Sequence, residues 1–333
     1  MSKKKERVLY LDVARSIAVL WIVGYWHLRV YCGKDYTDPY LSFPGDEWIT
    51  KVVLGLFMFI SGVLISKYTF DQFKKDCFSF YKKRFTRFYL LYAISIILLY
   101  MMEYNSLFGR FCLLTSLTMT STYLLPQPRT LWFFSMIASF YIFTPFIMKK
   151  FPKSTLYSFF IIYGVSIILM LFLPKGIDPR FFWCFPLYWG GLIIGRNEHV
   201  LNVVTSKSVI GGISFIIIFF QLLIIVLYPN QFVYLDFFSL PFSILFILYI
   251  SRSLSHPFIT RITSFIAYSS MSAYLFHREI YIILMEVYNN WGFNLPYWFS
   301  AITFLPICLI ISYFIQLAYD KSISSFSQKK TNK

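Results

Sequence analysis

The stretch LDVARSIAVLWIVGYWHLRVY, residues 11–31, is long and apolar enough to cross a membrane as a single helix. It nevertheless contains Asp12, Arg15 and His27, three ionisable residues that hydrocarbon penalises. Ionisable residues within a span usually face a cavity, a partner or a pathway. The stretch therefore predicts a membrane-spanning helix that also carries a candidate functional site.

The rest of the chain has the same apolar character. Of its 333 residues, 58% are hydrophobic, 22% are aromatic and only 14% are charged, and the mean hydropathy is +0.62. These values lie far outside the range of soluble globular proteins. We therefore expect an all-α polytopic membrane protein in which residues 1–320 form a single transmembrane domain and residues 321–333 form a short basic cytoplasmic tail.

A scan for apolar runs of about 20 residues predicts about ten transmembrane helices. They cover residues 8–31, 48–66, 88–102, 130–148, 154–173, 181–195, 208–228, 232–250, 262–286 and 297–318. An eleventh candidate, residues 107–125, is ambiguous because Arg110 and six Ser or Thr residues dilute it.

The distribution of basic residues decides between the two counts. With ten spans and a cytoplasmic N-terminus, 22 of the 31 Lys and Arg residues lie inside and seven lie outside. If residues 107–125 also crossed, the count would be 14 inside and 15 outside. The positive-inside rule favours ten spans with both termini in the cytoplasm. Residues 107–125 are then a re-entrant or interfacial segment.

The net charge of +16 would suggest a nucleic-acid partner in a soluble protein. Here the basic residues cluster between spans, where they set topology and contact anionic lipid, so we expect membrane lipid and no nucleic acid as a partner. The segment 67–89, KYTFDQFKKDCFSFYKKRFTRFY, carries seven basic residues among aromatic ones. It is either a topology determinant lying on lipid or a docking site for a polyanionic, nucleotide-like ligand, and the two roles are compatible.

The cysteines give no sign of a metal centre. The five residues, Cys32, Cys77, Cys112, Cys184 and Cys308, are scattered, without a C-x-x-C pair or a His at ligand spacing. We therefore expect neither a metal site nor a disulfide framework.

The ionisable residues that are energetically unfavourable in hydrocarbon lie mainly in the first and ninth spans. Arg15 and His27 lie twelve residues apart, about 18 Å along a helix, and so in opposite halves of the membrane. Arg15 either extends to the inner interface, where it can pair with Asp12, or faces a cavity. His27 is either an interfacial residue near the outer headgroups or a group that lines a cavity.

In the ninth span, His277, Arg278 and Glu279 are three consecutive ionisable residues that cannot all face one direction. Arg278 and Glu279 can satisfy each other in a structural role. His277 is the better candidate for chemistry, although a hydrogen-bonded packing role is equally compatible with its position.

Six segments together resemble the integral-membrane type-3 acyltransferase family, which includes bacterial O-acetyltransferases of lipopolysaccharide, enterobacterial common antigen, capsule and peptidoglycan. In the family's order they are LDVARSIAVLWIVGYWH (11–27), LFMFISGVLIS (56–66), KKRFTRFYLLY (82–92), TLWFFSMIASFYIFTPF (130–146), WGGLIIGR (189–196) and SSMSAYLFHREI (269–280). Each segment alone is a weak signal, but six in order on a ten-span chain are specific.

The resemblance implies transfer of an acyl group, usually acetyl from cytoplasmic acetyl-CoA, to a hydroxyl of a cell-surface or lipid-linked saccharide. It also implies a multi-pass protein of the bacterial cytoplasmic (inner) membrane. The family's essential Arg and His map onto Arg15 and His27, and its basic CoA-side motif maps onto Arg84 and Arg87, with Lys83 beside them. Residues expected to bind substrate or support the site come from the same matching segments: His277, Trp132, Tyr141 and Ser61.

Two departures from the family pattern matter. The family usually places ten residues between its first-span Arg and His, whereas eleven separate Arg15 from His27, which turns the two about 120° apart on an ideal helix. A one-residue π-bulge near Gly24 would restore a common face. The second departure is at Ile137 and Ala138, where many relatives have acidic residues, and it puts an acid-assisted role there in doubt.

The chemistry suits these residues. A neutral imidazole can accept the proton of a sugar hydroxyl as it attacks a thioester, so we expect His27 to act as general base or as a transient acyl acceptor. Arg15 would hold the CoA pyrophosphate or stabilise developing negative charge. The sequence leaves these roles open.

Two other classes of protein compete with the enzyme. One is a glycolipid or polysaccharide transporter or flippase, although the chain shows neither an internal two-fold repeat nor matched broken spans. The other is a non-catalytic subunit of a polysaccharide export system.

Overall fold

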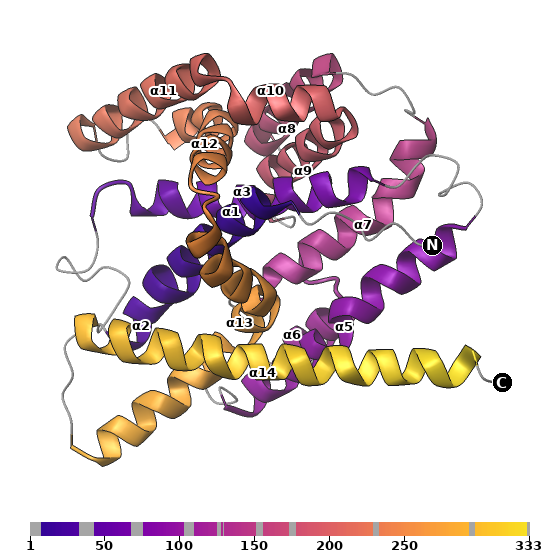
Figure 1. Ribbon diagram of the computed structural model, residues 1–333, viewed down its shortest axis with the longest axis vertical. Coiled ribbons are helices and arrows are strands. Elements are labelled where there is room, and N and C mark those ends of the chain that lie inside the picture. Colours follow the sequence, from indigo (N-terminus) through magenta and orange to yellow (C-terminus); the bar gives the residue numbers. More distant parts are fainter. Residues whose placement is uncertain are drawn as a thin grey trace. The chain divides into compact units, whose positions relative to one another are not determined.

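The structure, a computed structural model, describes residues 8–32, 43–67, 76–102, 110–124, 128, 130–150, 156–172, 178–228, 233–292 and 297–331. Every regular element in this part of the chain is a helix (Figure 1). The helices are α1 (Leu9–Val19), η1 (Leu20–His27), α2 (Leu28–Cys32), α3 (Asp46–Ser66), α5 (Cys77–Met102), α6 (Arg110–Leu117), α7 (Trp132–Lys150), α8 (Leu156–Phe172), α9 (Arg180–Arg196), α10 (Glu198–Ser206), α11 (Ser208–Leu227), α12 (Val233–Ser253), α13 (Pro257–Asn290) and α14 (Tyr297–Thr331).

Each of the ten predicted spans coincides with a helix, but six of the described helices are long and apolar enough to cross a membrane. These six are Leu9–Tyr31, Asp46–Ser66, Cys77–Met102, Ser208–Leu227, Leu235–Ser253 and Phe299–Ser325. Two further apolar helices, Trp132–Met148 and Tyr157–Met170, are shorter. The count of ten spans and the cytoplasmic position of the termini remain predictions.

The start of α5 differs from the expected boundary of the third span. The apolar run begins near residue 88, whereas the helix begins at Cys77 and includes the basic residues Lys82, Lys83, Arg84 and Arg87. A helix of 26 residues rises about 39 Å, more than the roughly 30 Å of hydrocarbon. Its basic first turns can therefore extend beyond the lipid while the apolar remainder crosses it. Residues 68–75 of the basic segment lie outside the described part.

The ambiguous stretch 107–125 contains a short helix followed by turns. The eight residues of α6 rise about 12 Å, too little to cross hydrocarbon. Neighbouring helices satisfy its polar groups: Tyr92 of α5 donates to the carbonyl of Ser116 (2.9 Å), and Ser121 donates to Ser135 of α7 (2.7 Å). This covered backbone agrees with the predicted non-crossing segment.

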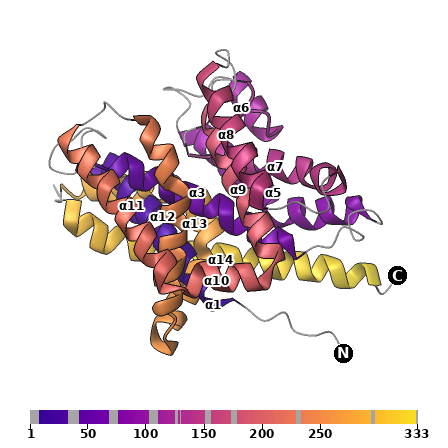
Figure 2. The same cartoon turned by 90° about the horizontal axis from the view of Figure 1, so that it is seen from above.

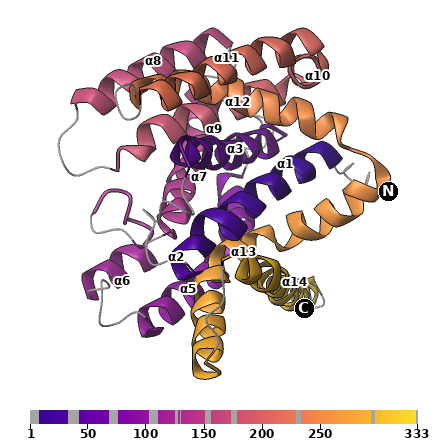
Figure 3. The ribbon, with the colours of Figure 1, turned by 90° about the vertical axis from the view of Figure 1, so that its left-hand side faces the viewer.

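The chain divides into two compact units, Met1–Val53 with Val204–Lys333, and Leu54–Val203. In the first unit, α13 packs against α1 and α14, and α12 packs against α1 and α11 (Figures 1 and 3). In the second, α8 packs on α9, and α5 packs on α6 and α7 (Figure 2). Helix α14 continues through residues 321–331, which the sequence analysis assigns to the tail.

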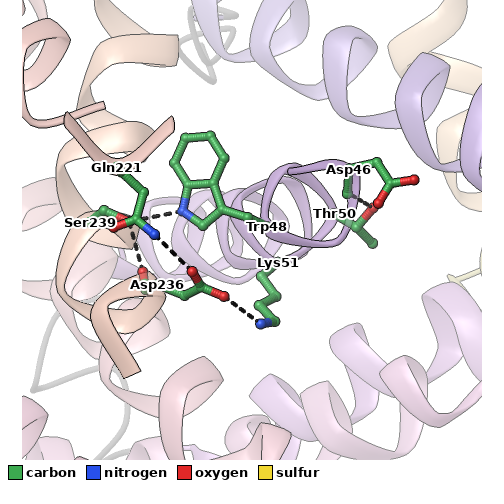
Figure 4. Close-up of polar contacts among 7 residues, drawn as sticks. All are labelled: Asp46, Trp48, Thr50, Lys51, Gln221, Asp236 and Ser239. Carbon is green, nitrogen blue, oxygen red and sulfur yellow. Dashed lines mark hydrogen bonds and ion pairs between the residues drawn. The ribbon is translucent and has the colours of Figure 1, made fainter. Parts of the chain in front are cut away.

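A polar network joins the first turns of α3 to α11 and α12 within the first unit (Figure 4). The Trp48 indole donates to Ser239 (2.8 Å), and Lys51 pairs with Asp236 (2.7 Å). Gln221 donates to the other oxygen of the Asp236 carboxylate (2.8 Å). Because Asp236 has partners on both oxygens, the network is satisfied and serves to fix three helices.

A buried ion pair joins α2 to α3 in the same unit. The Arg29 guanidinium is hydrogen-bonded to the Asp46 carboxylate, and it also lies 4.1 Å from the centroid of the Trp26 ring. Both charged side chains are buried, so each depends on the other for compensation.

In the second unit, α3 crosses α9 at backbone contact. A Cβ added to Gly62 would overlap the carbonyl oxygen of Tyr188, and one added to Gly191 would overlap that of Phe59. Small residues at a crossing let helices in a membrane approach closely enough for strong van der Waals packing. The contact therefore requires glycine at both positions.

We predict that Gly191→Ala destabilises the protein by about 1–3 kcal/mol, because the added methyl group meets backbone atoms that cannot rotate away. Thermal unfolding in detergent measures this effect. Gly164→Ala on α8 is the matched control, since nothing lies within 4 Å of its added Cβ. Equal unfolding temperatures for the two variants would contradict the tight crossing.

Candidate active site

The first span contains the π-helical segment that the spacing of Arg15 and His27 predicts. Residues Leu20–His27 form η1 between α1 and α2, and Gly24 lies within it, so the prediction of a π-bulge near Gly24 is confirmed. A π turn closes i→i+5 hydrogen bonds and so holds one residue more than an α turn. This extra residue accommodates the eleven-residue spacing.

Two contacts within the first unit hold the π segment in place. The Tyr281 hydroxyl of α13 donates to the carbonyl of Val23 (3.1 Å), which satisfies a buried backbone oxygen. Leu305 of α14 lies so close to Gly24 that an added Cβ would be 2.6 Å from its Cδ2 atom. The segment is therefore shaped by α13 and α14 as well as by its own residues.

The structure brings together two of the predicted site residues, His27 and His277. Their rings are stacked, with centroids 4.7 Å apart and planes 12° apart. His27 is 6% exposed and His277 is 0% exposed. Nδ1 of His277 lies 3.0 Å from the carbonyl oxygen of Ala273 and 2.9 Å from that of Tyr274.

Two ring nitrogens in this pair have no hydrogen-bond partner among the described residues. They are Nδ1 of His27 and Nε2 of His277, and both are buried. A buried polar atom without a partner is uncommon and often marks a functional site. This pair is the candidate chemical centre of the first unit.

Aromatic residues surround the pair. Tyr274 lies edge-on to both rings, at 6.4 Å from His27 and 6.0 Å from His277, and Tyr281 lies 6.0 Å from His277. These two tyrosines are not among the predicted site residues. The available signal is their spacing, because residues three before and four after His277 share its face on a helix.

Arg15 does not meet this pair. It lies half-buried on α1, roughly 18 Å along the helix before His27. Arg278 and Glu279 are buried beside His277 in sequence, and the Arg278 guanidinium lies 5.9 Å from the centroid of the Tyr31 ring. The structural role expected for these two residues stays a prediction.

In the second unit, the structure brings Arg84 and Tyr141 together. The Arg84 guanidinium lies 5.8 Å from the Tyr141 ring centroid and 5.9 Å from that of Phe80. Arg84 is half-buried, whereas Lys83 and Arg87 are exposed on the same helix. Basic groups next to aromatic faces form a surface that can hold a phosphate-bearing, planar ligand.

Trp132 and Ser61 lie elsewhere in this unit. Arg180 stacks 3.7 Å above the Trp132 ring and binds both carboxylate oxygens of Asp178 at 2.9 Å. Trp132 precedes Tyr141 by nine residues of α7, about 14 Å, so the two do not form one cluster. Ser61 is half-buried on α3 beside the glycine crossing. These positions do not link Trp132 or Ser61 to the other predicted site residues.

Among the described residues, no three His, Cys, Asp or Glu side chains gather as a metal ion would require. Independently of this, the basic and aromatic residues around Arg84 could hold a phosphate-bearing cofactor.

Comparison with known proteins identifies the family. A family model described as an acyltransferase domain, that of the type-3 acyltransferases, matches residues 8–317. Comparison with curated proteins and with solved structures gives no match. The match includes His27, His277, the basic start of α5, five of the six apolar helices and the larger part of the sixth. The chain is therefore a multi-pass membrane protein that belongs to the type-3 acyltransferase family.

Proposed function

We propose that the protein transfers an acyl group, acetyl in the first instance, from cytoplasmic acyl-CoA to a hydroxyl of a cell-surface or lipid-linked saccharide. The observation that carries the proposal is the buried, stacked pair of His27 and His277 in a chain whose family is that of acyltransferases. Acyl transfer to an alcohol needs a base, and a neutral imidazole is the side chain best suited to this at physiological pH.

His27 supplies the chemistry in this proposal. A sugar hydroxyl is a poor nucleophile until a base accepts its proton, a contribution typically worth about 10²- to 10⁴-fold in rate. An imidazole can also take the acyl group itself and pass it on, which divides the transfer into two easier steps. Both roles need a ring nitrogen that no protein group occupies, and Nδ1 of His27 meets that condition among the described residues.

The basic start of α5 supplies the donor site. Acyl-CoA carries a pyrophosphate and an adenine ring, which suit cationic groups and aromatic faces. Arg84, held over Tyr141, is the best-positioned cation, and Lys83 and Arg87 add exposed charge. Arg15, half-buried on α1, would bind the CoA arm or stabilise negative charge that develops during transfer.

The acceptor is an O-antigen, capsule or exopolysaccharide unit in this proposal, and the membrane is the bacterial cytoplasmic (inner) membrane. Mass spectrometry of surface glycan from cells with and without the gene tests both points together. The expected result is a loss of acetyl groups from one sugar when the gene is absent. An unchanged glycan in several growth conditions would contradict a saccharide acceptor.

We predict that His27→Ala lowers acetyl transfer from labelled acetyl-CoA to membrane saccharides by about 10²- to 10⁴-fold, because the imidazole is lost. The measurement is label in extracted glycolipid, and unfolding in detergent checks that the variant is folded. Normal transfer by a folded His27→Ala variant would exclude this residue from the chemistry. His256→Ala is the matched control, since His256 caps α13 and lies outside the stacked pair.

We predict that deletion of Leu20 leaves transfer within about tenfold of the wild type. Leu20 is exposed at the start of η1, and without it a plain α-helix supplies the spacing that the π turn now provides. Deletion of both Leu20 and Trp21 turns His27 by about 100° relative to Arg15 and lowers transfer by about 10²-fold or more. Equal losses in both deletions would show that the π turn has a role beyond spacing.

We predict that Arg84→Ala raises the KM for acyl-CoA by about 10- to 100-fold and leaves kcat nearly unchanged, because a charge-assisted contact to a ligand is lost in ground and transition state alike. The KM of Arg84→Lys is expected to lie between those of the wild type and Arg84→Ala, since lysine keeps the charge but not the planar group. Lys82→Ala is the control, because Lys82 is exposed on the same helix and its loss is expected to leave the KM nearly unchanged. An unchanged KM in Arg84→Ala would remove Arg84 from the donor site.

A further inference from the structure

The hydrogen bonds of His277 determine which of its nitrogens carries the proton. Nδ1 lies 3.0 and 2.9 Å from two backbone carbonyl oxygens, those of Ala273 and Tyr274. A carbonyl oxygen can only accept a hydrogen bond, so Nδ1 must donate one. In the neutral ring Nε2 then has a lone pair and no proton, which makes it the basic atom of His277.

Nε2 of His277 makes no hydrogen bond to a described residue that would explain it as a structural group. Nε2 of His277 is buried, and it has no hydrogen-bond partner among the described residues. The backbone contacts at Nδ1 fix the orientation of the ring, as a hydrogen bond to one nitrogen does for imidazoles that bind or react through the other. A packing histidine needs no such unpaired base, so the arrangement points to a ligand that meets Nε2.

The stack excludes a direct proton relay between the two histidines. Lone pairs and N–H groups of imidazole lie in the ring plane, and the two planes are only 12° from parallel with centroids 4.7 Å apart. Each ring therefore presents its nitrogens alongside the other's rather than towards them. Two such rings can act on one substrate from adjacent positions.

The same geometry suits a particular division of roles. An acyl group on an imidazole nitrogen is conjugated with the ring and lies in its plane. A nucleophile attacks the acyl carbon from above or below that plane. If His27 carries the acyl group, a hydroxyl that approaches from one of these faces passes the ring of His277, which is stacked there.

We infer that His277 is a catalytic residue, with Nε2 as the base that deprotonates the acceptor hydroxyl while His27 carries the acyl group. The inference rests on the proposed function and deepens it, since it chooses the acyl-acceptor role for His27.

The two steps balance. In the first, a ring nitrogen of His27 attacks the thioester carbonyl, the C–S bond breaks, and the thiolate leaves and takes the remaining imidazole proton to give free CoA. In the second, the hydroxyl oxygen attacks the acyl carbon, its proton goes to Nε2 of His277, and the C–N bond to His27 breaks. A water molecule then takes the proton from Nε2 of His277 and gives one to the His27 imidazolate, because the stack excludes direct transfer, and both rings end neutral.

The test separates two steps: charging, in which the protein gains an acetyl group from acetyl-CoA, and discharge, in which the protein passes that group to saccharide. Full-length protein in detergent is incubated with labelled acetyl-CoA alone, and protein-bound label that neutral hydroxylamine releases is measured. Membranes from cells that lack the gene are then added as the source of saccharide acceptor, and loss of label from the protein is followed. Wild type is expected to gain label and to lose it to saccharide.

His277→Asn is the decisive variant because the Asn amide can still donate from the position of Nδ1, while the base at Nε2 is gone. It is expected to gain label at the wild-type rate and to discharge it about 10²- to 10⁴-fold more slowly. His27→Asn, the matched control, is expected to gain no label. His277→Gln, which lacks the base as well, takes the place of His277→Asn if only the Gln variant unfolds at the wild-type temperature.

Each alternative outcome has a definite meaning. Discharge at the wild-type rate in a folded His277→Asn variant would overturn the role of His277, as would its failure to gain label. Saccharide acetylation by wild type without any protein-bound label would overturn the inference and leave the proposed function intact. Failure of wild type to acetylate any saccharide would overturn the proposed function and the inference with it.

Discussion

Hydrocarbon offers no hydrogen-bond partner, so the polar groups of a membrane helix depend on partners within the protein, and this constraint explains most of the polar contacts described above. Lys51, Gln221 and Asp236 satisfy one another across three helices. Tyr281 supplies the donor that the π segment needs at Val23. Nδ1 of His27 and Nε2 of His277 differ from these groups, because both are buried and neither has a hydrogen-bond partner in the part of the chain that the structure describes.

The π segment connects sequence spacing to the position of the chemistry. An extra residue between Arg15 and His27 would turn the imidazole away from the face that Arg15 uses, and η1 accommodates that residue without breaking the helix. Contacts from α13 and α14 then hold the widened turn at Val23 and Gly24. The position of His27 is thus determined jointly by its own helix and by helices that lie more than 250 residues later.

Local patterns predict the helices and the π-bulge well, because hydropathy and spacing are properties of neighbouring residues. They predict pairs across the fold poorly. The sequence alone identifies His27 and His277 as residues that are unfavourable in hydrocarbon. Their rings stack only because α13 packs on the first span in the folded protein. Trp132 illustrates the same limit: its motif predicts a site residue, and only the structure shows that Arg180, paired with Asp178, lies over its ring, so its role in a site stays a prediction. Length is also misjudged, since α5 extends eleven residues before its apolar run.

The order of the two units along the chain has a consequence for biosynthesis. Leu54–Val203 is continuous, so it can assemble as soon as it leaves the ribosome, whereas the other unit needs both ends of the chain. Lys51 must wait for Asp236, which is 185 residues later, or about 10–40 s of translation at 5–20 residues per second. During that interval Trp48 and Lys51 lack the partners that α12 supplies, Ser239 and Asp236. These contacts of α3 can therefore form only once α12 is made, whereas the contacts within Leu54–Val203 can form earlier.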